Sequence, residues 1–500
     1  MFKQAILEPF VRSAIEHAES NAFCFNGEYQ CYRVFVQRIV TIAQSLEKNP
    51  GQEIALITND DLDTYAAIFA IWFTGKMYVP LSPETPDEKN RTIIDLIGAR
   101  TILNSEEMAT LDSVDYESSV KWLESKLDDP DFDDQLAYTF FTSGSTGTPK
   151  GVTISKQNLA SFIEAFWALG YQIDETDRCL QMFELTFDLS VMSYLVPLIR
   201  GACVYTIPRD KIRYGYVFEL MDEKELTVAL MVPSILNYLR PYFEEIDCPK
   251  MRYSLFCGEA LHEQIVEEWA GCVPNARIDN VYGPTENTIF CTCYRFHQGG
   301  ENDACNGVLS IGKSMLNNLA VVFSEGDQPA AVSEIGELCL AGGQLTPGYL
   351  DNPQLNADMF FTVEYEGVHT RFYRTGDLCV LRENGNIDYV GRKDTQVKIQ
   401  GFRIELSEVE FHVKNAIEEQ SPVVALAIQN AAGNNEIGVV FEAKAFDTTA
   451  LKEYLTNCMS SYMIPTQYYF VDSFPLNTNG KIDRKKLTAT VVGDPVRPQL

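Results

Sequence analysis

The sequence predicts an α/β protein: a large N-terminal domain of parallel-rich sheets with flanking helices, a β-barrel-like unit that closes it, and a small α+β domain at the C-terminus. Three observations lead to this fold class. The chain has 500 residues, more than one hydrophobic core usually serves. Its first hundred residues alternate between β-rich and helix-like stretches. From about Gly336 the pattern changes to short alternating strands.

The N-terminal part alternates strands and helices. A strand-like EIALIT at 53–58 precedes a helical pattern at 61–76, and YVPL follows. Four further short β-rich runs each lie beside a helical pattern, namely Cys203 to Ile207, Val228 to Val232, Ser254 to Cys257 and Arg277 to Val281. Parallel sheets covered by helices are therefore expected. The first twenty residues predict an amphipathic helix rather than a signal peptide, and the acidic stretch at 127–134 predicts an exposed loop.

The C-terminal part predicts a change of architecture and a domain boundary. GELCLAG and LCVLRENGNIDYVG, with their Gly and Asn turns, suit a β-meander that closes the large domain. After Gly391 a mixed α+β pattern runs for roughly a hundred residues, an ordinary size for an independent domain. We place the boundary near Asp394, with residues 1–393 as the N-terminal core and 394–500 as the C-terminal domain.

The charge balance argues against polyanionic partners. Forty basic and seventy acidic side chains give a net charge of −30, which repels nucleic acid and anionic membranes at long range. A nucleotide would have to be held by local backbone donors and a few focused cations. We expect neither a nucleic-acid partner nor membrane insertion, because the longest apolar run, Ala66 to Phe73, is too short to cross a bilayer. Thirteen cysteines without a C-x-x-C pair predict reduced thiols and a cytoplasmic protein.

The sharpest motif is TSGSTGTPKG at Thr142 to Gly151, directly after the strand-like AYTFF. Small residues let backbone N–H groups crowd around a phosphate, and Lys150 adds a mobile positive charge. The string lacks Walker spacing, and Ser143 stands where a nucleophile elbow needs Gly. A flexible surface loop is the alternative for a generic Ser/Gly stretch, but a ten-residue string ending in Pro-Lys-Gly is harder to obtain by chance.

This string begins a resemblance that spans nearly the whole chain. The chain resembles the adenylate-forming ligases, specifically the amino-acid adenylation domains of nonribosomal peptide synthetases and their stand-alone relatives. Eight further strings carry the resemblance, in order YVPLSP, TFDLSVM, FCGEAL, NVYGPTE, GELCLAG, YRTGD, GRKDTQVKIQGFRIE and NTNGKIDRKKL.

The chemistry of several residues in these strings suggests a binding role for each. Tyr282 offers a flat face for a purine, and Glu286 offers a hard oxygen ligand for Mg²⁺. Asp377 can accept hydrogen bonds from the vicinal hydroxyls of a ribose. The resemblance implies the same roles. The alternatives are a Gly-Pro turn with a core tyrosine at 282 and a backbone-capping aspartate at 377.

The resemblance implies an ATP- and Mg²⁺-dependent reaction with two catalytic residues, Lys481 and Glu286. Lys481 neutralises oxygens in the adenylation transition state, although a surface lysine is the alternative. The small domain is then expected to be mobile and to rotate about a hinge at Asp394, which brings the loop at Lys398 to Gly401 towards the adenylate. The implied nucleotide-binding residues are Thr142, Ser143, Gly144, Ser145, Thr146, Gly147, Lys150, Gly258, Glu259, Asn280, Tyr282, Gly283, Thr285, Asp377, Arg392 and Lys481.

The substrate prediction depends mainly on Asp188. A carboxylate in an apolar pocket needs a cationic partner, which an α-ammonium supplies; a helix cap is the alternative. The resemblance adds Leu189, Cys257 and Gly283 to the substrate site. Cys257 is typical of stand-alone ligases that load D-alanine onto a carrier protein in the teichoic-acid system, although a free cysteine is more often a buried small hydrophobe.

Two departures keep other small amino acids open: Ser193-Tyr194-Leu195 follows TFDLSVM, and Asn287 follows GPTE. Because no Ser lies in an obvious phosphopantetheine-attachment motif, we expect the phosphopantetheinylated carrier protein to be a separate chain. A catalytically silent carrier-binding or nucleotide-sensing homologue and an acyl-CoA synthetase are the competing functions.

Overall fold

The computed structural model describes the chain except residues 50, 131–132, 143–148, 418–421, 477–481 and 493–500. The chain forms two compact units. Unit 1 comprises Met1–Pro83, Ile94–Phe141 and Gly151–Lys393, and unit 2 comprises Glu84–Ile93, Thr142–Lys150 and Asp394–Leu500. Two short segments that the sequence analysis placed in the N-terminal core, 84–93 and 142–150, thus group with the C-terminal residues. The functional roles given to the two domains stay predictions.

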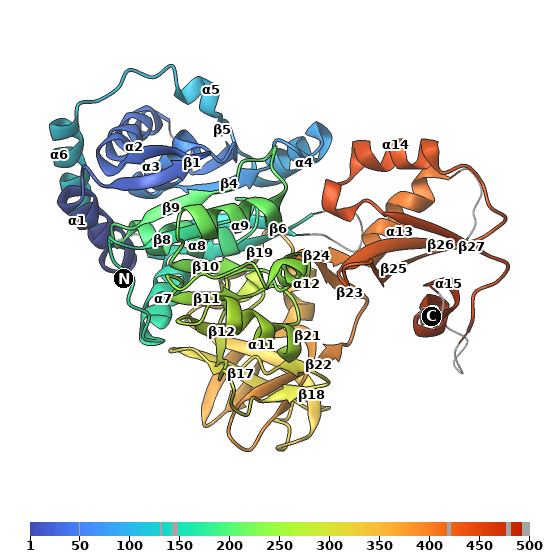
Figure 1. The fold of residues 1–500 in the computed structure, drawn as a ribbon. Helices are drawn as coiled ribbons and strands as arrows, with labels where there is room; N and C mark the ends of the chain where they lie inside the picture. The colour runs from blue at the N-terminus through green and yellow to red at the C-terminus, as the bar shows by residue number, and fades with distance from the viewer. Residues whose placement is uncertain (50, 131–132, 143–148, 418–421, 477–481, 493–500) are drawn as a thin grey trace. The chain divides into compact units, whose positions relative to one another are not determined.

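The largest sheet of unit 1 has nine strands in the order β16-β13-β12-β11-β10-β8-β9-β1-β2. Its central strands β12, β11, β10, β8, β9 and β1 are parallel, and the outer strands β2, β13 and β16 are antiparallel to their neighbours. β10, β11 and β12 follow one another across the sheet in Figure 1. The strands are β1 (Asn21–Phe25), β2 (Glu28–Cys31), β8 (Arg178–Gln181), β9 (Cys203–Thr206), β10 (Val228–Met231), β11 (Tyr253–Phe256), β12 (Arg277–Tyr282), β13 (Thr292–Arg295) and β16 (Lys313–Ser314).

A second sheet has six strands in the order β19-β7-β6-β4-β3-β5. β3 pairs in parallel with β4 and β5, and β4 with β6, whereas β19 is antiparallel to β7. These strands are β3 (Glu53–Ile57), β4 (Met77–Leu81), β5 (Thr101–Leu103), β6 (Leu136–Thr142), β7 (Lys150–Ser155) and β19 (Gly348–Tyr349). The predicted α/β class with parallel sheets is therefore confirmed.

Two helices of unit 1 are buried around nearly their whole circumference. Every residue of α8 (Leu189–Leu198) is buried, as is every residue of α3 (Leu62–Phe73) from Thr64 onward. Both helices are apolar on all sides, which is typical of helices with no solvent-exposed face. α8 contacts β8 and β9 of the nine-stranded sheet, and its Tyr194 hydroxyl lies 3.1 Å from that of Tyr78 on β4 of the six-stranded sheet. α8 therefore fills the space between the two sheets.

Other helices cover the outer faces. α2 packs on α3 and α6, and α10 packs on α9 and α11. The predicted N-terminal helix is present as a π-helical turn at Lys3–Leu7 that leads into α1. The other α-helices described between residues 1 and 393 are α1 (Glu8–Glu16), α2 (Tyr32–Glu47), α4 (Asp87–Ile97), α5 (Ser105–Met108), α6 (Tyr116–Leu127), α7 (Lys156–Ala168), α9 (Arg213–Glu223), α10 (Ser234–Leu239), α11 (Glu263–Cys272) and α12 (Pro353–Met359). No helix in the described ranges combines the length and apolarity that crossing a membrane requires.

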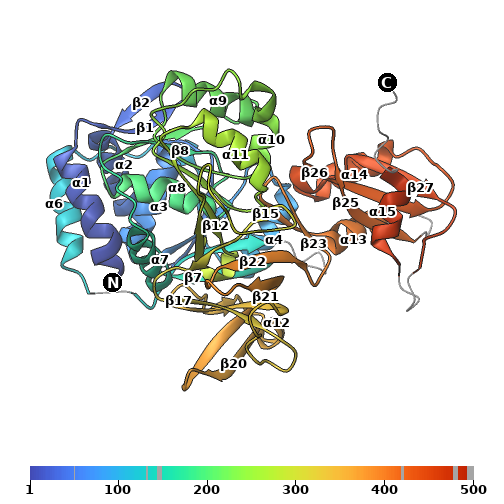
Figure 2. The same cartoon turned by 60° about the horizontal axis from the view of Figure 1, so that its bottom comes forward.

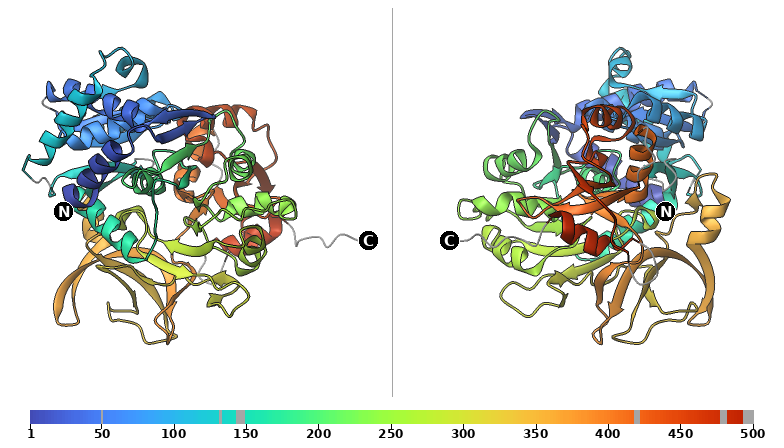
Figure 3. Two further views of the ribbon diagram at one scale, coloured as in Figure 1. Left: turned by 60° about the vertical axis from the view of Figure 1, so that its left-hand side comes forward. Right: turned by 90° about the vertical axis from the view of Figure 1, so that its right-hand side faces the viewer.

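Five strands between residues 318 and 392 form an antiparallel sheet, visible with its long strands in Figure 2 and at the lower edge of both views in Figure 3. β21 is fourteen residues long and pairs with β20 through its first half and with β22 through its second half. The strands are β17 (Asn318–Phe323), β18 (Ile335–Gly342), β20 (Phe360–Tyr365), β21 (Val368–Leu381) and β22 (Ile387–Arg392); a short ribbon of β14 (Ala304–Cys305) and β15 (Val308–Leu309) precedes them.

Unit 2 has its own apolar core, built from residues such as Ile404, Val409, Val439 and Phe441. β25 and β26 are antiparallel, β27 is parallel to β26, and β23 and β24 form a separate hairpin. Its further elements are β23 (Gln396–Ile399), β24 (Phe402–Glu405), α13 (Leu406–Ala416), β25 (Val423–Gln429), β26 (Asn435–Glu442), α14 (Thr449–Cys458), β27 (Gln467–Val471) and α15 (Arg484–Val492).

Candidate functional site

The carboxyl ends of neighbouring parallel strands carry many of the predicted residues. Asp188 follows β8, Cys257 follows β11, and Glu286 lies in the loop after β12. Because the carboxyl ends of parallel strands lie at one edge of a sheet, these loops are brought to the same edge. Ligands of open α/β sheets bind in the crevice outside that edge, so the topology supports a common site in unit 1.

Tyr282, Asp377 and Arg392 form one hydrogen-bonded cluster. The Tyr282 hydroxyl donates to Asp377 Oδ2 at 2.5 Å, and an Arg392 guanidinium nitrogen donates to Asp377 Oδ1 at 2.7 Å. Arg392 also donates to the Thr375 carbonyl at 3.1 Å. Asp377 and Arg392 are directly opposite each other on β21 and β22, so the hairpin register creates the ion pair.

The cluster is buried and still has acceptor capacity. Asp377 is 5% exposed and Tyr282 is 8% exposed. Burial, and then the neighbouring Asp377 charge, raise the pKa of Tyr282 well above its usual value, so its hydroxyl keeps its proton. A carboxylate has about four lone-pair sites, and two hydrogen bonds leave Asp377 able to accept from a pair of hydroxyls. The Tyr282 ring also belongs to an apolar cluster with Cys291 and Leu338, so a structural role for this ring is evident and its purine-binding role stays a prediction.

Glu286 lies in the short 3-10 turn Thr285–Asn287 and is 1% exposed. Its Oε1 accepts a hydrogen bond from the Tyr349 hydroxyl at 2.6 Å, and its backbone carbonyl accepts from the Thr346 N–H at 2.9 Å. The Tyr349 hydroxyl in turn lies 3.4 Å from that of Tyr373. The carboxylate is therefore held from both its backbone and its side chain, as the ligands of a metal ion commonly are.

Gly283 permits the loop to fold back on itself. A Cβ atom at this position would lie 2.3 Å from the Cα of Phe290 and 3.0 Å from the Cys291 backbone nitrogen. The Cys291 N–H also donates to the Tyr282 carbonyl at 2.8 Å. Only glycine allows two stretches of backbone to approach this closely, which accounts for its place in the NVYGPTE string.

Asp188 precedes α8 and is 4% exposed. Its side chain makes no hydrogen bond with the first turn of α8, whose residues are all described, so it is not a conventional helix cap. Burial raises the pKa of Tyr78 and Tyr138, and the negative charge of Asp188 raises both further. The carboxylate therefore lies among buried tyrosines, and the Tyr138 hydroxyl has no hydrogen-bond partner within the described part of the chain.

Other predicted residues of unit 1 lie at the start of α8, directly after β11 or on β12. Cys257 and Leu189 are each 2% exposed. Gly258 has a positive φ of 98°, and Glu259 accepts a hydrogen bond at 2.8 Å from the Ser234 N–H at the start of α10. The Asn280 amide donates to the Leu309 and Ser310 carbonyls at 3.3 and 2.9 Å, which gives it a structural role.

Six predicted residues lie outside the described ranges: Ser143, Gly144, Ser145, Thr146, Gly147 and Lys481. Thr142 ends β6 and Lys150 begins β7, so the two ends of the TSGSTGTPKG string lie on neighbouring strands. The Asp394 carboxylate accepts a hydrogen bond from the Gln396 N–H at 3.1 Å. Its role as a hinge, and the roles of the loop residues and Lys481, stay predictions.

Several residues that support the site have no role predictable from the sequence. Tyr349 binds Glu286, and Gln344 binds the loop that follows Glu286. Neither residue had a local signal, because each reaches the site from a segment about sixty positions away. Tyr78 belongs to the YVPLSP string, but its position beside Asp188 depends on the packing of β4 against α8.

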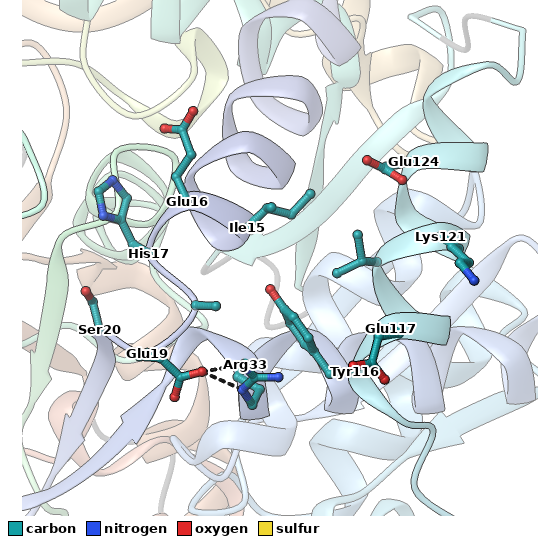
Figure 4. A pocket seen from close by; sticks show the side chains of 12 residues that line it. Ile15, Glu16, His17, Glu19, Ser20, Arg33, Tyr116, Glu117, Lys121 and Glu124 are labelled. Atoms are coloured by element: carbon teal, nitrogen blue, oxygen red, sulfur yellow. Dashed lines mark hydrogen bonds and ion pairs between the residues drawn. The ribbon is translucent and has the colours of Figure 1, made fainter.

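A separate cavity of about 640 Å³ lies between the end of α1, the start of α2 and α6 (Figure 4). Glu19 and Arg33 form an ion pair at its wall, and Arg33 lies 4.2 Å from the centre of the Tyr116 ring. None of the predicted site residues lines this cavity. It is therefore distinct from the site at the carboxyl edge of the sheet.

Comparison with known proteins gives concordant results. The profile of a family described as AMP-binding enzyme matches residues 10–350. The chain is 30% identical to gramicidin S synthase 2 of Aneurinibacillus migulanus, over 97% of this chain and 11% of that protein. It is 32% identical to a dimodular nonribosomal peptide synthase of Bacillus subtilis (strain 168), over 97% of this chain and 21% of that protein. The chain thus spans about a tenth to a fifth of the length of these relatives.

Solved structures of adenylation domains have a fold similar to that of this chain. The Vibrio cholerae adenylation domain AlmE, in complex with glycyl-adenosine-5'-phosphate, has a TM-score of 0.86 and is 25% identical, with 97% of each chain covered. An artificially fused adenylation–PCP di-domain NRPS from Klebsiella oxytoca has a TM-score of 0.79 at 22% identity, covering 92% of this chain and 93% of that chain.

Proposed function

Because the chain belongs to the AMP-binding enzyme family, we propose that it uses ATP and Mg²⁺ to activate a small amino acid as its acyl-adenylate. Pyrophosphate is released, and the aminoacyl group then passes to the phosphopantetheine thiol of a separate carrier protein. D-alanine is the substrate that the sequence resemblance favours. The AlmE structure, which holds a glycyl-adenylate, supports a substrate of this size.

The observation that carries the proposal is the buried carboxylate of Asp188. At 4% exposure, and lying in front of α8 without capping it, this group is suited to bind an α-ammonium. In such a desolvated environment the negative charge of Asp188 would attract a cationic substrate group more strongly than a neutral one. Fatty acids and aryl acids lack such a group.

The nucleotide half of the site draws on unit 1. Asp377, held by Tyr282 and Arg392, is proposed to accept hydrogen bonds from the ribose hydroxyls. The ion pair with Arg392 orients this carboxylate, and the Tyr282 ring would lie against the purine. The segment between the strand ends at Thr142 and Lys150, which groups with unit 2, is proposed separately to bind phosphate.

Glu286 suits a Mg²⁺ ion, because Mg²⁺ takes oxygen ligands and is commonly held by one or two carboxylates together with substrate phosphates. When bound, the ion would neutralise charge on the phosphate oxygens. Tyr349 donates to Oε1, which fixes the direction of the carboxylate. Thr346 holds the backbone of the same residue.

The reaction is a displacement at phosphorus. An oxygen of the substrate carboxylate forms a bond to the α-phosphorus of ATP, the bond from that phosphorus to the bridging oxygen breaks, and pyrophosphate leaves with the electron pair. In the second step the thiol gives its proton to solvent and its sulfur bonds to the carbonyl carbon. The bond from that carbon to the phosphate oxygen breaks, and AMP leaves with the electron pair. Asp188 and Asp377 hold the two reactants in place, and this positioning converts a bimolecular encounter into an intramolecular one. Lys481 is proposed to stabilise the charge that develops in the first step.

Pyrophosphate exchange tests the proposal. The purified protein is incubated with ATP, Mg²⁺, labelled pyrophosphate and one acid at a time from a panel of D-alanine, L-alanine, glycine, serine and propionate. Exchange with a small amino acid and none with propionate is the expected result. A preference for an amino acid other than D-alanine would exclude the D-alanine assignment but keep the reaction.

Two results would contradict the reaction itself. No exchange with any acid, at adequate Mg²⁺, would favour a catalytically silent homologue. Exchange with propionate that is insensitive to Asp188→Ala would favour an acyl-CoA synthetase. Transfer is tested separately, by the mass increase of a phosphopantetheinylated carrier protein after incubation with enzyme, ATP and the preferred acid.

A further inference from the structure

The loop after Glu286 holds two adjacent residues in a left-handed backbone conformation. Thr288 has φ of 50° and Ile289 has φ of 72°. Both side chains are β-branched, a class for which positive φ is a genuine outlier. Both residues are also essentially fully buried. Such strain persists only where the surrounding structure over-determines the conformation, and it concentrates at functional sites.

The side-chain amide of Gln344 provides this restraint. Its Nε2 carries two N–H groups and lies within hydrogen-bond distance of three loop carbonyls, so one N–H is shared between two of them. These carbonyls are those of Asn287 at 3.2 Å, Thr288 at 3.0 Å and Phe290 at 2.8 Å. Its Oε1 accepts from Asn318 Nδ2 at 2.6 Å, which fixes the orientation of the amide. The Thr288 hydroxyl donates to the Gln344 backbone carbonyl at 2.6 Å. Gln344 is fully buried, so water does not compete for these bonds.

The segment that begins with Gln344 then reaches Glu286 itself. Two residues further on, the Thr346 N–H donates to the Glu286 carbonyl, and Tyr349 donates to the Glu286 carboxylate. Hydrogen bonds from the segment 344–349 thus reach the strained loop at both of its ends, at the Glu286 carbonyl and at the Phe290 carbonyl. Movement of one requires movement of the other.

From this geometry we propose that Gln344 is a positioning residue, which holds the loop 286–290 in its strained form and thereby fixes the Glu286 carboxylate for a divalent cation. The inference rests on the proposed function, because it assigns the support of the metal ligand in that same site. An amide is required at this position. A carboxylate would place negative charge against three carbonyl oxygens, and an apolar side chain would leave them without their donor.

A matched pair of isosteric variants tests the inference. Gln344→Glu removes the donor that faces the loop but keeps the size and an oxygen acceptor. Asn158→Asp makes the same chemical change on another contact of the same segment, since the Asn158 amide donates to the Gly343 and Leu345 carbonyls at 2.8 and 3.0 Å. Gln344→Met is the second Gln344 variant, used if the glutamate variant does not fold.

The first measurement is the Mg²⁺ concentration that gives half-maximal pyrophosphate exchange at saturating ATP and amino acid. We expect the Gln344 variants to raise it by about tenfold or more, the usual effect of removing a residue that orients a metal ligand, whereas Asn158→Asp leaves it unchanged. An unchanged Mg²⁺ requirement in an active Gln344 variant would overturn the inference.

The second measurement needs neither metal nor activity. Hydrogen exchange of peptides covering residues 285–291 in the metal-free protein should be faster in the Gln344 variants than in the wild type and in Asn158→Asp. If the wild type shows no pyrophosphate exchange, the proposed function fails, and this measurement still decides whether Gln344 holds the loop. Equal rates of hydrogen exchange at residues 285–291 in the wild type and all variants would refute the inference that Gln344 holds the loop.

Discussion

Replacement of Asp188 by Asn isolates the contribution of one charge to substrate choice. The two side chains have nearly the same volume, so the substitution creates no cavity. Asp188 is 4% exposed, and a cationic group bound to it would lie in a desolvated environment. Truncating one partner of a buried, hydrogen-bonded charge pair costs about 2–5 kcal/mol. A value of about 3 kcal/mol corresponds to roughly a hundredfold change in an equilibrium constant.

The assay is steady-state pyrophosphate exchange with D-alanine, or with the preferred amino acid, and with propionate, which is D-alanine without its amine. We expect Asp188→Asn to raise the KM for the amino acid by about a hundredfold and to leave the KM for ATP unchanged, because the lost contact is made to the amine in both ground and transition states. The preference for the amino acid over propionate should fall by a similar factor.

Asp177→Asn is the matched control. Asp177 is 1% exposed and in the same unit, and it is bonded to Arg252 at 2.7 and 2.8 Å and to the Thr227 hydroxyl at 2.6 Å. The substitution should lower thermal stability, because it weakens an ion pair and hydrogen bonds made by a buried carboxylate, but it should leave both KM values unchanged. The reasoning is refuted if Asp188→Asn stays folded and active and its KM for the amino acid rises by less than about threefold.

Three further predictions follow from the structure and the resemblance. Gly283→Ala places a Cβ 2.3 Å from the Phe290 Cα, so we expect a loss of about 3 kcal/mol or more and a lower thermal midpoint, whereas Gly271→Ala, in open space in α11, should stabilise by up to about 1 kcal/mol. Burial lowers the pKa of Lys156 from 10.5 to about 7, so between these values the unfolded chain binds more protons and stability rises with pH. From pH 7 to 9 the free energy of unfolding should increase by about 2 kcal/mol. Chemical denaturation of Lys156→Met over the same pH range should not show this increase. Lys481→Ala should reduce pyrophosphate exchange at least about a hundredfold while ATP binding, measured by calorimetry, persists.

Local patterns were sufficient to predict the strands that build the site. The predicted runs at 228–232 and 277–281 correspond to β10 and β12 within one residue at each end, because short β-branched stretches between helical patterns have few alternatives. The Gly-Asn turn at 384–386 likewise predicted the hairpin of β21 and β22. The sequence motifs also named both members of the Asp377–Arg392 ion pair.

Side-chain contacts between distant segments could not be predicted in this way. The pairing of Asp377 with Arg392 depends on the register of a hairpin that contains an irregularity between Leu378 and Cys379. The contacts of Tyr349 with Glu286 and of Tyr194 with Tyr78 depend on how separate layers pack. Neither kind of contact has a local periodicity, since register and layer packing are properties of the assembled sheets.

Two unfavourable backbone conformations, those of Thr288 and Ile289, lie where the site is expected. Two adjacent β-branched residues at positive φ cost about 1–3 kcal/mol each, and they lie within three positions of Glu286. A chain selected only for stability would place Gly or Asn there, because those residues adopt positive φ at little cost. Thr288 and Ile289 are instead buried, and the Thr288 hydroxyl and the Gln344 amide supply the bonds that hold them. Natural sequences break local rules mainly at functional sites, so the strain itself is evidence that the position of Glu286 matters.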